Sequence, residues 1–250
     1  MRELGKAMQA NLDQVLTKIN SLGACTHDIE LHARLRSIFS DLQIPSFIFS
    51  TFNLDANGTA SSYRFLVGCS AEWIQIYQHR HWYSNDPYLQ YARFNASPAP
   101  GSVIPITSAG QREMRATARQ YGFRSNLVVP AHSRATSLLG VLHIANNVEM
   151  EDGGEARLLE WQSLLRAISL TLLDMRTAAQ HQLMVARFGL DARDLTALQF
   201  VLAGEPAQEV ARSLGLSVAS VYSMYSRINE KLGVNRINEA ARLAQQYDLL

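Results

Sequence analysis

Three side chains that can bind a small polar molecule occur close together in the sequence: Trp73, Tyr77 and Asp86. An indole N–H and a phenol O–H can donate to carbonyl oxygens, and a carboxylate can accept from an amide N–H. A molecule that is buried whole needs such partners, because each unpaired polar group costs about 1–3 kcal/mol. These residue types are therefore suited to bind a buried ligand that carries both hydrogen-bond donors and acceptors.

The same three residues also have a purely structural interpretation. Trp73 and Tyr77 are four residues apart, so on a helix they would share one face and could form an ordinary core pair. Asp86 precedes Pro87, and many helices begin in this way, with Asp as the N-cap and Pro as the first helical residue. Capping and ligand binding are compatible for Asp86, since a carboxylate has two oxygens.

A second group of residues predicts a DNA-binding element near the C-terminus. Residues 209–214 are expected to form a short helix, Gly215 a tight turn, and Ser217 the cap of a second helix. The apolar stripe of that second helix comprises Val221, Met224 or Tyr225, Ile228 and Leu232. The opposite face is left free, and this arrangement delivers a helix to the major groove of DNA.

The predicted contacts with DNA lie on the second helix and just after it. Base edges are expected near its exposed residues, which are Ser217, Val218, Ala219, Tyr222, Ser223 and Ser226. Phosphates are expected near Arg227, Lys231 and Arg236. Residues 190–250 nevertheless hold six basic and seven acidic side chains, without the basic surface that usually marks a DNA-binding domain. This balance predicts weak non-specific affinity and a need for two copies to supply enough phosphate contacts.

Hydrophobic periodicity predicts the elements that position these groups. Helices are expected over residues 5–21, 28–42, 71–77, 87–94, 107–121 and 151–178. Strands are expected over residues 47–53, 62–67, 127–131 and 138–145, with a loop or edge strand over 95–105. In the helix expected over residues 28–42, Asp28 is expected as the cap and Ile29 as part of the apolar face.

The order of these elements predicts an α+β protein with two domains. Residues 1–176 are expected to form an N-terminal α/β/α sandwich with a mostly antiparallel sheet. Residues 177–189 are the best candidate for a linker. Residues 190–250 are expected to form an all-α, four-helix helix-turn-helix domain.

Composition restricts the class of protein. An apolar content of 47% and a charged content of 18% in 250 residues favour buried cores over disorder. No apolar run reaches the roughly 20 residues of a membrane span, and the first residues lack the apolar segment of a secretory signal. The only cysteines, Cys25 and Cys69, argue against a disulfide framework and fit a reducing cytoplasm.

Sequence motifs argue against an enzyme. The chain has no Gly-x-Ser-x-Gly turn, no histidine cluster of a zinc hydrolase, no phosphate-binding loop and no Gly-rich dinucleotide turn. We therefore expect no catalysis and no cofactor. His79 and His81 form an isolated His-x-His pair, which favours a solvated helix end over a metal site.

These motifs resemble those of the LuxR-type quorum-sensing transcription factors, which join an acyl-homoserine-lactone-binding domain to a helix-turn-helix. The family's opening C-terminal motif falls on Leu190, Asp191, Arg193, Asp194, Leu198 and Gly204. Its later motif falls on Glu209, Val210, Ala211, Leu214, Ser217, Ser220, Val221, Ile228, Lys231, Leu232, Gly233, Val234 and Asn235. In the N-terminal part, the resemblance rests on Trp73 and Tyr77 followed by Asp86-Pro87 at the family's spacing.

The resemblance implies a role for each of these residues. Trp73 would bind a lactone carbonyl, Asp86 would accept from the ligand amide N–H, and Tyr77 would bind an amide carbonyl. It further implies a cytoplasmic homodimer, paired through helices 151–178 and 237–247, that binds a pseudo-palindromic promoter site and activates transcription. Neither a membrane nor a metal is implied as a partner.

Four positions depart from the family pattern. Gly101 stands where a second pocket Trp is usual, Asn126 where Gly is common, His143 where a small hydroxyl residue is typical, and Cys69 where a pocket Tyr is frequent. We therefore add Cys69, Asn126 and His143 to the candidate ligand-binding residues and expect the missing indole to leave space. The ligand would be an acyl-homoserine lactone with an unusual chain or a different small signal. The alternative is a regulator of the same fold that senses a non-lactone signal or a protein partner.

Overall fold

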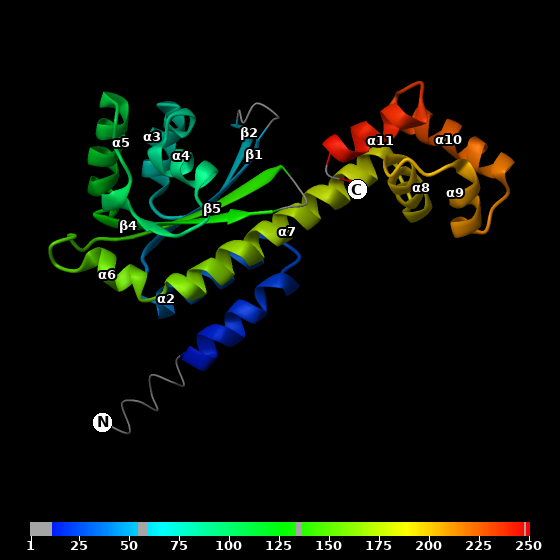
Figure 1. Cartoon of the computed structure of the whole chain (residues 1–250). Helices are drawn as coiled ribbons and strands as arrows, with labels where there is room; N and C mark the ends of the chain where they lie inside the picture. Colours follow the sequence, from blue (N-terminus) through cyan, green and yellow to red (C-terminus); the bar gives the residue numbers. More distant parts are fainter. Residues whose placement is uncertain (1–11, 55–59, 134–136, 248) are drawn as a thin grey trace. The chain divides into compact units, whose positions relative to one another are not determined.

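The computed structural model of the chain describes residues 12–54, 60–133, 137–247 and 249–250 (Figure 1). It divides into two compact units, with the boundary between Met175 and Arg176. The N-terminal unit combines a sheet with helices and the C-terminal unit is helical, which confirms the predicted fold class. No helix within the described residues is both long and apolar enough to cross a membrane.

A five-stranded antiparallel sheet with the strand order β2-β1-β5-β4-β3 forms the centre of the N-terminal unit. Its strands are β1 (Ser46–Leu54), β2 (Ala60–Gly68), β3 (Ala99–Pro100), β4 (Ser125–His132) and β5 (Leu138–Asn146). Side chains of β1 alternate, so that Phe47 and Phe49 pack on one face while Ile48 and Phe52 pack on the other. Because both faces are apolar, each needs a layer of helices to cover it.

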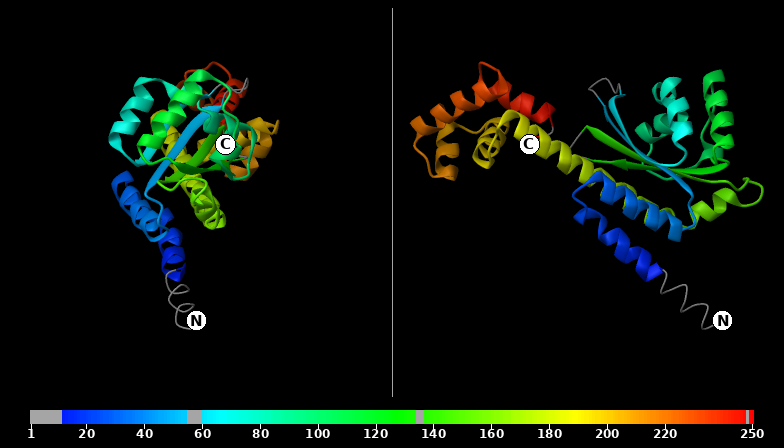
Figure 2. Two further views of the ribbon diagram at one scale, coloured as in Figure 1. Left: turned by 90° about the vertical axis from the view of Figure 1, so that its left-hand side faces the viewer. Right: turned by 180° about the vertical axis from the view of Figure 1, so that it is seen from behind.

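Helices cover both faces of the sheet, as Figures 1 and 2 show. One face packs against α2 (Asp28–Asp41), α6 (Gly154–Leu159) and the first half of α7 (Gln162–Phe188). The other face packs against α3 (Ala71–His79), α4 (Pro87–Phe94) and α5 (Ala109–Gln120). This is the predicted α/β/α sandwich, with an aromatic-rich core beneath α3, α4 and α5.

The start of the N-terminal unit differs in detail from the prediction. His27, not Asp28, is the N-cap of α2, and Asp28 is the first helical residue. Ile29 is 85% exposed, because it lies about 200° around the helix from the buried Leu31. The helix expected over residues 5–21 is present at residues 12–20, and its first residues lie outside the described part of the chain. Short 3-10 turns occupy Leu22–Ala24, Trp82–Ser84 and Gly101–Val103.

The prediction of a single long helix over residues 151–178 is wrong, because two helices, α6 and α7, occupy this region. Gly153, with φ of 82°, holds a left-handed conformation that delays the helical start to Gly154. A tight turn then separates α6 from α7, where the Trp161 amide bonds to the Leu158 carbonyl three residues earlier (3.2 Å). Helix α7 continues to Phe188, since residues 177–188 contain good helix formers and neither Gly nor Pro. The candidate linker is therefore helical as far as Phe188.

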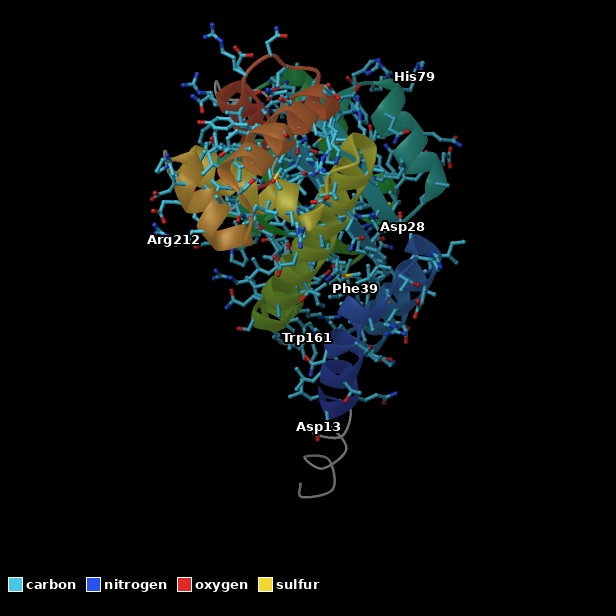
Figure 3. All side chains as sticks on the ribbon, turned by 90° about the vertical axis from the view of Figure 1, so that its right-hand side faces the viewer. Asp13, Asp28, Phe39, His79, Trp161 and Arg212 are labelled. Carbon is cyan, nitrogen blue, oxygen red and sulfur yellow. The ribbon has the colours of Figure 1, made fainter. Side chains whose placement is uncertain are left out.

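The C-terminal unit contains four helices after the end of α7. They are α8 (Ala192–Leu202), α9 (Ala207–Leu214), α10 (Val218–Leu232) and α11 (Ile237–Gln246). Gly215 takes φ of 65° between α9 and α10, which is the predicted turn. The fully buried Leu198, Val210 and Ile228 come from α8, α9 and α10 and join these helices into one core, while Arg212 lies on the outside (Figure 3).

Candidate functional site

Helix α3 brings Trp73 and Tyr77 to the inner side of the aromatic-rich core. Ser70 caps the helix by accepting from the Trp73 amide (3.4 Å), and the spacing of four residues then places both rings on one face. Trp73 is 3% exposed and Tyr77 is 6% exposed. Their ring centroids are 5.7 Å apart, so the two aromatic side chains are in direct contact.

Asp86 is held by three hydrogen bonds at the start of α4. Its Oδ1 accepts from the backbone amides of Tyr88 (2.7 Å) and Leu89 (3.3 Å), which is the predicted N-cap, with Pro87 as the first helical residue. Its Oδ2 accepts from the Tyr77 hydroxyl at 2.7 Å. Burial raises the pKa of Asp86 to about 6, although the bonds from Tyr77, Tyr88 and Leu89 lower it. The pair of Tyr77 and Asp86 is therefore fixed before any ligand arrives.

The indole N–H of Trp73, in contrast to this pair, makes no hydrogen bond with the described residues. Its Nε1 atom is nevertheless buried. The surrounding rings of Tyr77, Trp82, Tyr121 and Phe123 lie with centroids 5.7–6.2 Å from that of Trp73 and enclose it. A buried donor without an acceptor costs free energy, so this N–H is suited to bind an acceptor on a ligand.

A small cavity lies between the sheet and the helices α3, α4 and α5. It is lined by Ile48, Ser50, Phe65, Trp73, Ile74, Tyr77, Asp86, Tyr88, Leu89, Met114, Ala118, Val141 and His143. The cavity thus brings together four of the predicted ligand-binding residues, which are Trp73, Tyr77, Asp86 and His143. Its volume of about 30 Å³ is close to that of one water molecule. A larger ligand could enter only if lining side chains moved.

His143 extends from β5 into this cavity as a neutral ring. Burial lowers its pKa to about 4, so the imidazole is uncharged at neutral pH. Its Nε2 lies 3.1 Å from Oδ1 of Asn126 and donates to it in the tautomer that carries the ring proton on Nε2. The Nδ1 atom then retains its lone pair and can accept a hydrogen bond.

Asn126 does not line the small cavity, and it fills the space that was expected beside Gly101. A Cβ at Gly101 would lie only 2.2 Å from Oδ1 and 2.5 Å from Nδ2 of Asn126. The departures from the family pattern at positions 101 and 126 are therefore coupled. The Asn126 side chain from β4 occupies space that a side chain at position 101 would need. Asn126 therefore fills part of the space expected at Gly101, and Gly101 also lines a separate hollow of about 300 Å³.

Cys69 also lies outside the cavity lining. It is partly buried and packs against the aromatic-rich core beside Ser70. Burial raises the pKa of its thiol to about 12, which leaves it protonated at neutral pH.

Tyr88 was missed by the sequence analysis, although it follows directly after Pro87. Its ring is 3% exposed and lies 4.7 Å from the His143 ring. Tyr88, Leu89 and Ala92 are the buried residues of α4 after Pro87, and their helical spacing could have identified them as an inward face.

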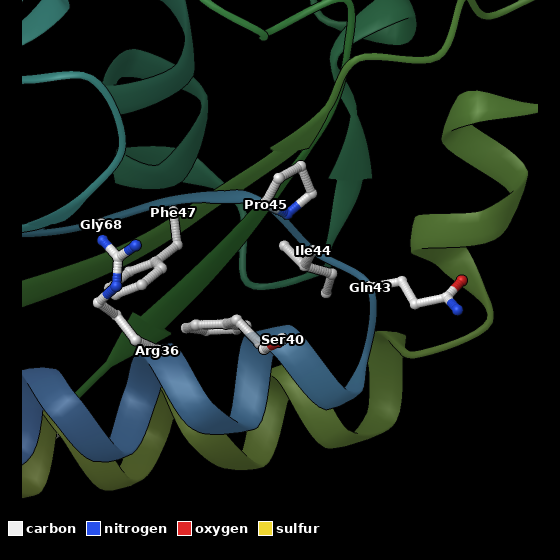
Figure 4. A pocket seen from close by; sticks show the side chains of 8 residues that line it. Arg36, Ser40, Gln43, Ile44, Pro45, Phe47 and Gly68 are labelled. Atoms are coloured by element: carbon white, nitrogen blue, oxygen red, sulfur yellow. The ribbon is translucent and has the colours of Figure 1, made fainter.

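A more open hollow, of about 470 Å³, lies on the opposite face of the sheet beside α2 (Figure 4). Arg36, Ser40 and Gln43 line one part of it, and Phe47 and Gly68 line another. A Cβ at Gly68 would come within 1.9 Å of the Phe47 ring, so only glycine fits there. This hollow contains none of the predicted ligand-binding residues.

In the C-terminal unit, the predicted base-reading face of α10 is exposed. Ser217 caps the helix by accepting from the Ser220 amide (3.1 Å). The exposed residues include Ser217, Val218, Ala219, Tyr222, Ser223, Ser226 and Arg227, and Tyr222 is 60% exposed. Val221, Met224, Tyr225 and Ile228 point inward, as the apolar stripe predicts.

Two of the three predicted phosphate contacts are engaged within the unit. Asp194 has a fully buried side chain, and it accepts from Arg227 (2.7 Å) and Lys231 (2.6 Å). Burial raises the pKa of Asp194, but the hydrogen bonds from Lys231 and Arg227 outweigh this effect and hold it below its usual value. Both cations therefore tie α10 to α8, although half of the Arg227 side chain is exposed. Arg236 is exposed just before α11.

Two families match this chain. Residues 29–172 match the family described as "Autoinducer binding domain", and residues 189–244 match "Bacterial regulatory proteins, luxR family". No curated protein sequence matches significantly.

Several solved structures share the fold at low sequence identity. A crystal structure of Escherichia coli SdiA has a TM-score of 0.62 and 16% identity, covering 95% of this chain and 98% of that one. SdiA in complex with octanoyl-rac-glycerol has a TM-score of 0.60 and 14% identity, covering 94% and 95%. The acylhomoserine-lactone-dependent factor CepR2 from Burkholderia cenocepacia has a TM-score of 0.52 and 12% identity, covering 64% and 91%.

Proposed function

The chain belongs to the LuxR-type family of autoinducer-binding transcription regulators, and we propose that its signal is an amide-containing acyl compound such as an acyl-homoserine lactone. Members of this family are ligand-responsive regulators of transcription and are not enzymes. We further propose that occupancy of the cavity at Trp73 and Asp86 promotes DNA binding by a homodimer that activates transcription.

The observation that carries this proposal is the unpartnered indole N–H of Trp73 beside the bonded pair of Tyr77 and Asp86. Asp86 can accept from an amide N–H, and Trp73 can donate to a carbonyl oxygen. A ligand with both groups would satisfy the donor and gain a charge-assisted hydrogen bond, while its acyl chain would contact the apolar lining.

Two of the related structures support an acyl chain with a polar head. CepR2 is named for acylhomoserine lactone and one SdiA structure holds octanoyl-rac-glycerol. An amide N–H and a glycerol hydroxyl are both donors that Asp86 could accept from. Calorimetry with acyl-homoserine lactones and acyl glycerols of matched chain length would test the proposal and distinguish these heads. Absence of binding by every lactone would exclude the first head group.

Ligand binding would act by a shift in population. The described cavity holds about one water, so a ligand needs a state in which the aromatic lining has moved apart. A ligand that binds only that state stabilises it by RT ln(1 + [L]/Kd). The alternative is a regulator that senses a protein, and it predicts no retained compound when the purified protein is analysed by mass spectrometry after expression with candidate signals.

Trp73→Phe is expected to weaken ligand binding about fivefold to tenfold, and its cost in stability is limited to the packing that the smaller ring loses. The variant removes the N–H that the ligand would satisfy, and a hydrogen bond of this kind contributes about 1 kcal/mol. The fold loses no hydrogen bond, since this atom has no partner in it. Calorimetry and thermal unfolding would measure both effects. Trp161→Phe, partly buried against the core on the other face of the sheet, serves as the control. Equal ligand affinity in Trp73→Phe and wild type would contradict the assignment.

Tyr222→Ala is expected to weaken DNA binding about tenfold without unfolding the C-terminal unit. Tyr222 is 60% exposed on α10, so its loss removes a contact to bases and not a core residue. The measurement is fluorescence anisotropy with a duplex selected from a random pool by the wild-type protein. Ser213→Ala on α9 is the matched exposed control. If both variants bind like wild type, α10 does not read bases through Tyr222.

The charge of the C-terminal residues supports the proposed homodimer. Residues 190–250 hold six basic and seven acidic side chains, so one copy has few cations for phosphates. Two copies would double these contacts and place two helices in successive major grooves. Analytical ultracentrifugation with and without ligand would test the dimer, and a promoter reporter would test activation. A monomer that footprints DNA with full affinity would contradict the dimer.

A further inference from the structure

A second hollow adjoins the small cavity on the side of Gly101. Its volume is about 300 Å³, and it is lined by Tyr88, Gly101, Ser102, Arg115, Arg119, Phe123, Arg124, Asn126, Met150, Glu151 and Glu155. Tyr88 lines both spaces. The hollow is thus separated from the small cavity by Tyr88 and by the hydrogen-bonded pair of Asn126 and His143.

The charged side chains of the hollow differ in how far they are already engaged. Arg119 and Arg124 both bond to Glu149, at 2.6 and 3.1 Å. Glu155 accepts from the backbone amide and the hydroxyl of Ser102. Arg115 alone among the arginines of the lining makes no hydrogen bond or ion pair with the described residues. The hollow therefore offers one uncommitted guanidinium.

Arg115 also lies near Tyr88, the residue that lines both the hollow and the small cavity. It lies close enough to the Tyr88 hydroxyl for its charge to lower the pKa of that group, although burial has the larger effect and raises it to about 12. A side-chain hydrogen bond from Asn126 also lowers the pKa of Tyr88. Tyr88 and Arg115 both line the hollow, so its polar groups include a phenol and a guanidinium.

We propose that the ligand of this protein carries a carboxylate that lies in the hollow at Arg115, and that it belongs to the class of N-acyl amino acids. The inference rests on the proposed function, since the amide of the same ligand would lie at Trp73 and Asp86. A planar carboxylate matches the donors of a guanidinium in two-pronged fashion. Glu151 and Glu155 at the same hollow disfavour a doubly charged phosphate.

The test compares an acyl-homoserine lactone with the open-chain acyl-homoserine of the same chain length. The two differ by one water, so the acyl chain and the amide are matched while only one carries a carboxylate. The expected result is that the open acid binds about fivefold or more tightly than the lactone, and that added salt weakens the acid alone. Mass spectrometry after each titration would verify that the lactone ring stayed closed.

Two variants make the comparison specific. Arg115→Gln is expected to remove the preference for the acid, while Arg112→Gln, exposed on the same helix but outside the lining, is expected to keep it. The double variant Gly101→Trp with Asn126→Gly exchanges the side chain that fills the space beside Gly101 and is expected to shift the preference towards the lactone. Thermal unfolding identifies a variant that does not fold.

The outcomes separate the two proposals. Binding of neither compound to wild type would overturn the proposed ligand class itself. Tight binding of the lactone with weaker binding of the acid, or an acid preference that persists in Arg115→Gln, would overturn the carboxylate site and leave the amide site in place.

Discussion

The folding stability of the wild-type protein is expected to fall by about 3 kcal/mol between pH 4 and pH 7 because of Asp86. Asp86→Asn is expected to abolish this fall. Burial raises the pKa of this carboxyl from 3.8 to about 6 in the folded state. The folded protein therefore binds this proton more tightly than the unfolded chain, and stability falls as the pH rises through that interval. Asparagine keeps the shape and the capping oxygen without the charge.

Urea unfolding at several pH values between 4 and 7.5 would measure this effect. The free energy of unfolding of Asp86→Asn relative to wild type should increase with pH and level off near pH 7. Asp174→Asn, which removes an exposed carboxylate from α7, provides the control. Parallel curves for Asp86→Asn would show that Asp86 titrates normally and is not buried as described.

The same substitution separates stability from ligand binding. An amide N–H binds more strongly to a charged carboxylate than to a neutral carboxyl. The wild-type affinity for an amide ligand should therefore increase as the pH rises towards 7, and Asp86→Asn should lose both this increase and most of the affinity. Calorimetry at pH 5 and pH 7 would measure it, and a rise of equal size in the variant would contradict the role of Asp86.

Asp194→Asn is expected to destabilise the C-terminal unit by about 2–3 kcal/mol and to abolish specific DNA binding. The carboxylate is fully buried and accepts from Arg227 and Lys231. Without its charge, Lys231 loses its ion pair, and Arg227 keeps only the longer ion pair with Asp191 (3.8 Å). The effect is below that of a wholly buried pair, because the Arg227 side chain is half exposed.

Thermal unfolding and DNA anisotropy would measure this second effect, and calorimetry would show whether ligand binding by the N-terminal unit is retained. Glu230→Gln removes an exposed carboxylate from the same helix and should leave all three measurements unchanged. The opposite result, a stable Asp194→Asn protein with increased DNA affinity, would indicate that Arg227 and Lys231 contact phosphates once they are released.

Local sequence patterns predicted the elements and the residues that act within one element. The cap at Asp86 and Pro87, the inward pair of Trp73 and Tyr77, and the turn at Gly215 each depend on neighbours a few residues away. Such features follow from backbone geometry and from helical or strand spacing. The same reasoning gave the two-layer covering of the sheet and the exposed face of α10.

Contacts between distant elements could not be predicted in this way. The bonds from Arg227 and Lys231 to Asp194 span 33 and 37 residues, and periodicity reveals a face but not the partner opposite. The sequence marks Asn126 and Gly101 as two separate departures from the family pattern. That the Asn126 side chain fills the space beside Gly101 is visible only when β4 and the turn after β3 lie side by side. The break between α6 and α7 was not predicted either, because the apolar pattern continues across it.

The internal engagement of Arg227 and Lys231 has a consequence for how the regulator would search a genome. Each phosphate that a protein neutralises steepens the fall of log affinity with log salt by about 0.9. With two cations held by Asp194, this slope would be shallow for each copy, and random chromosomal sequence would retain the protein only briefly. Promoter occupancy would then depend on paired, correctly spaced half-sites and change little with the osmotic state of the cell.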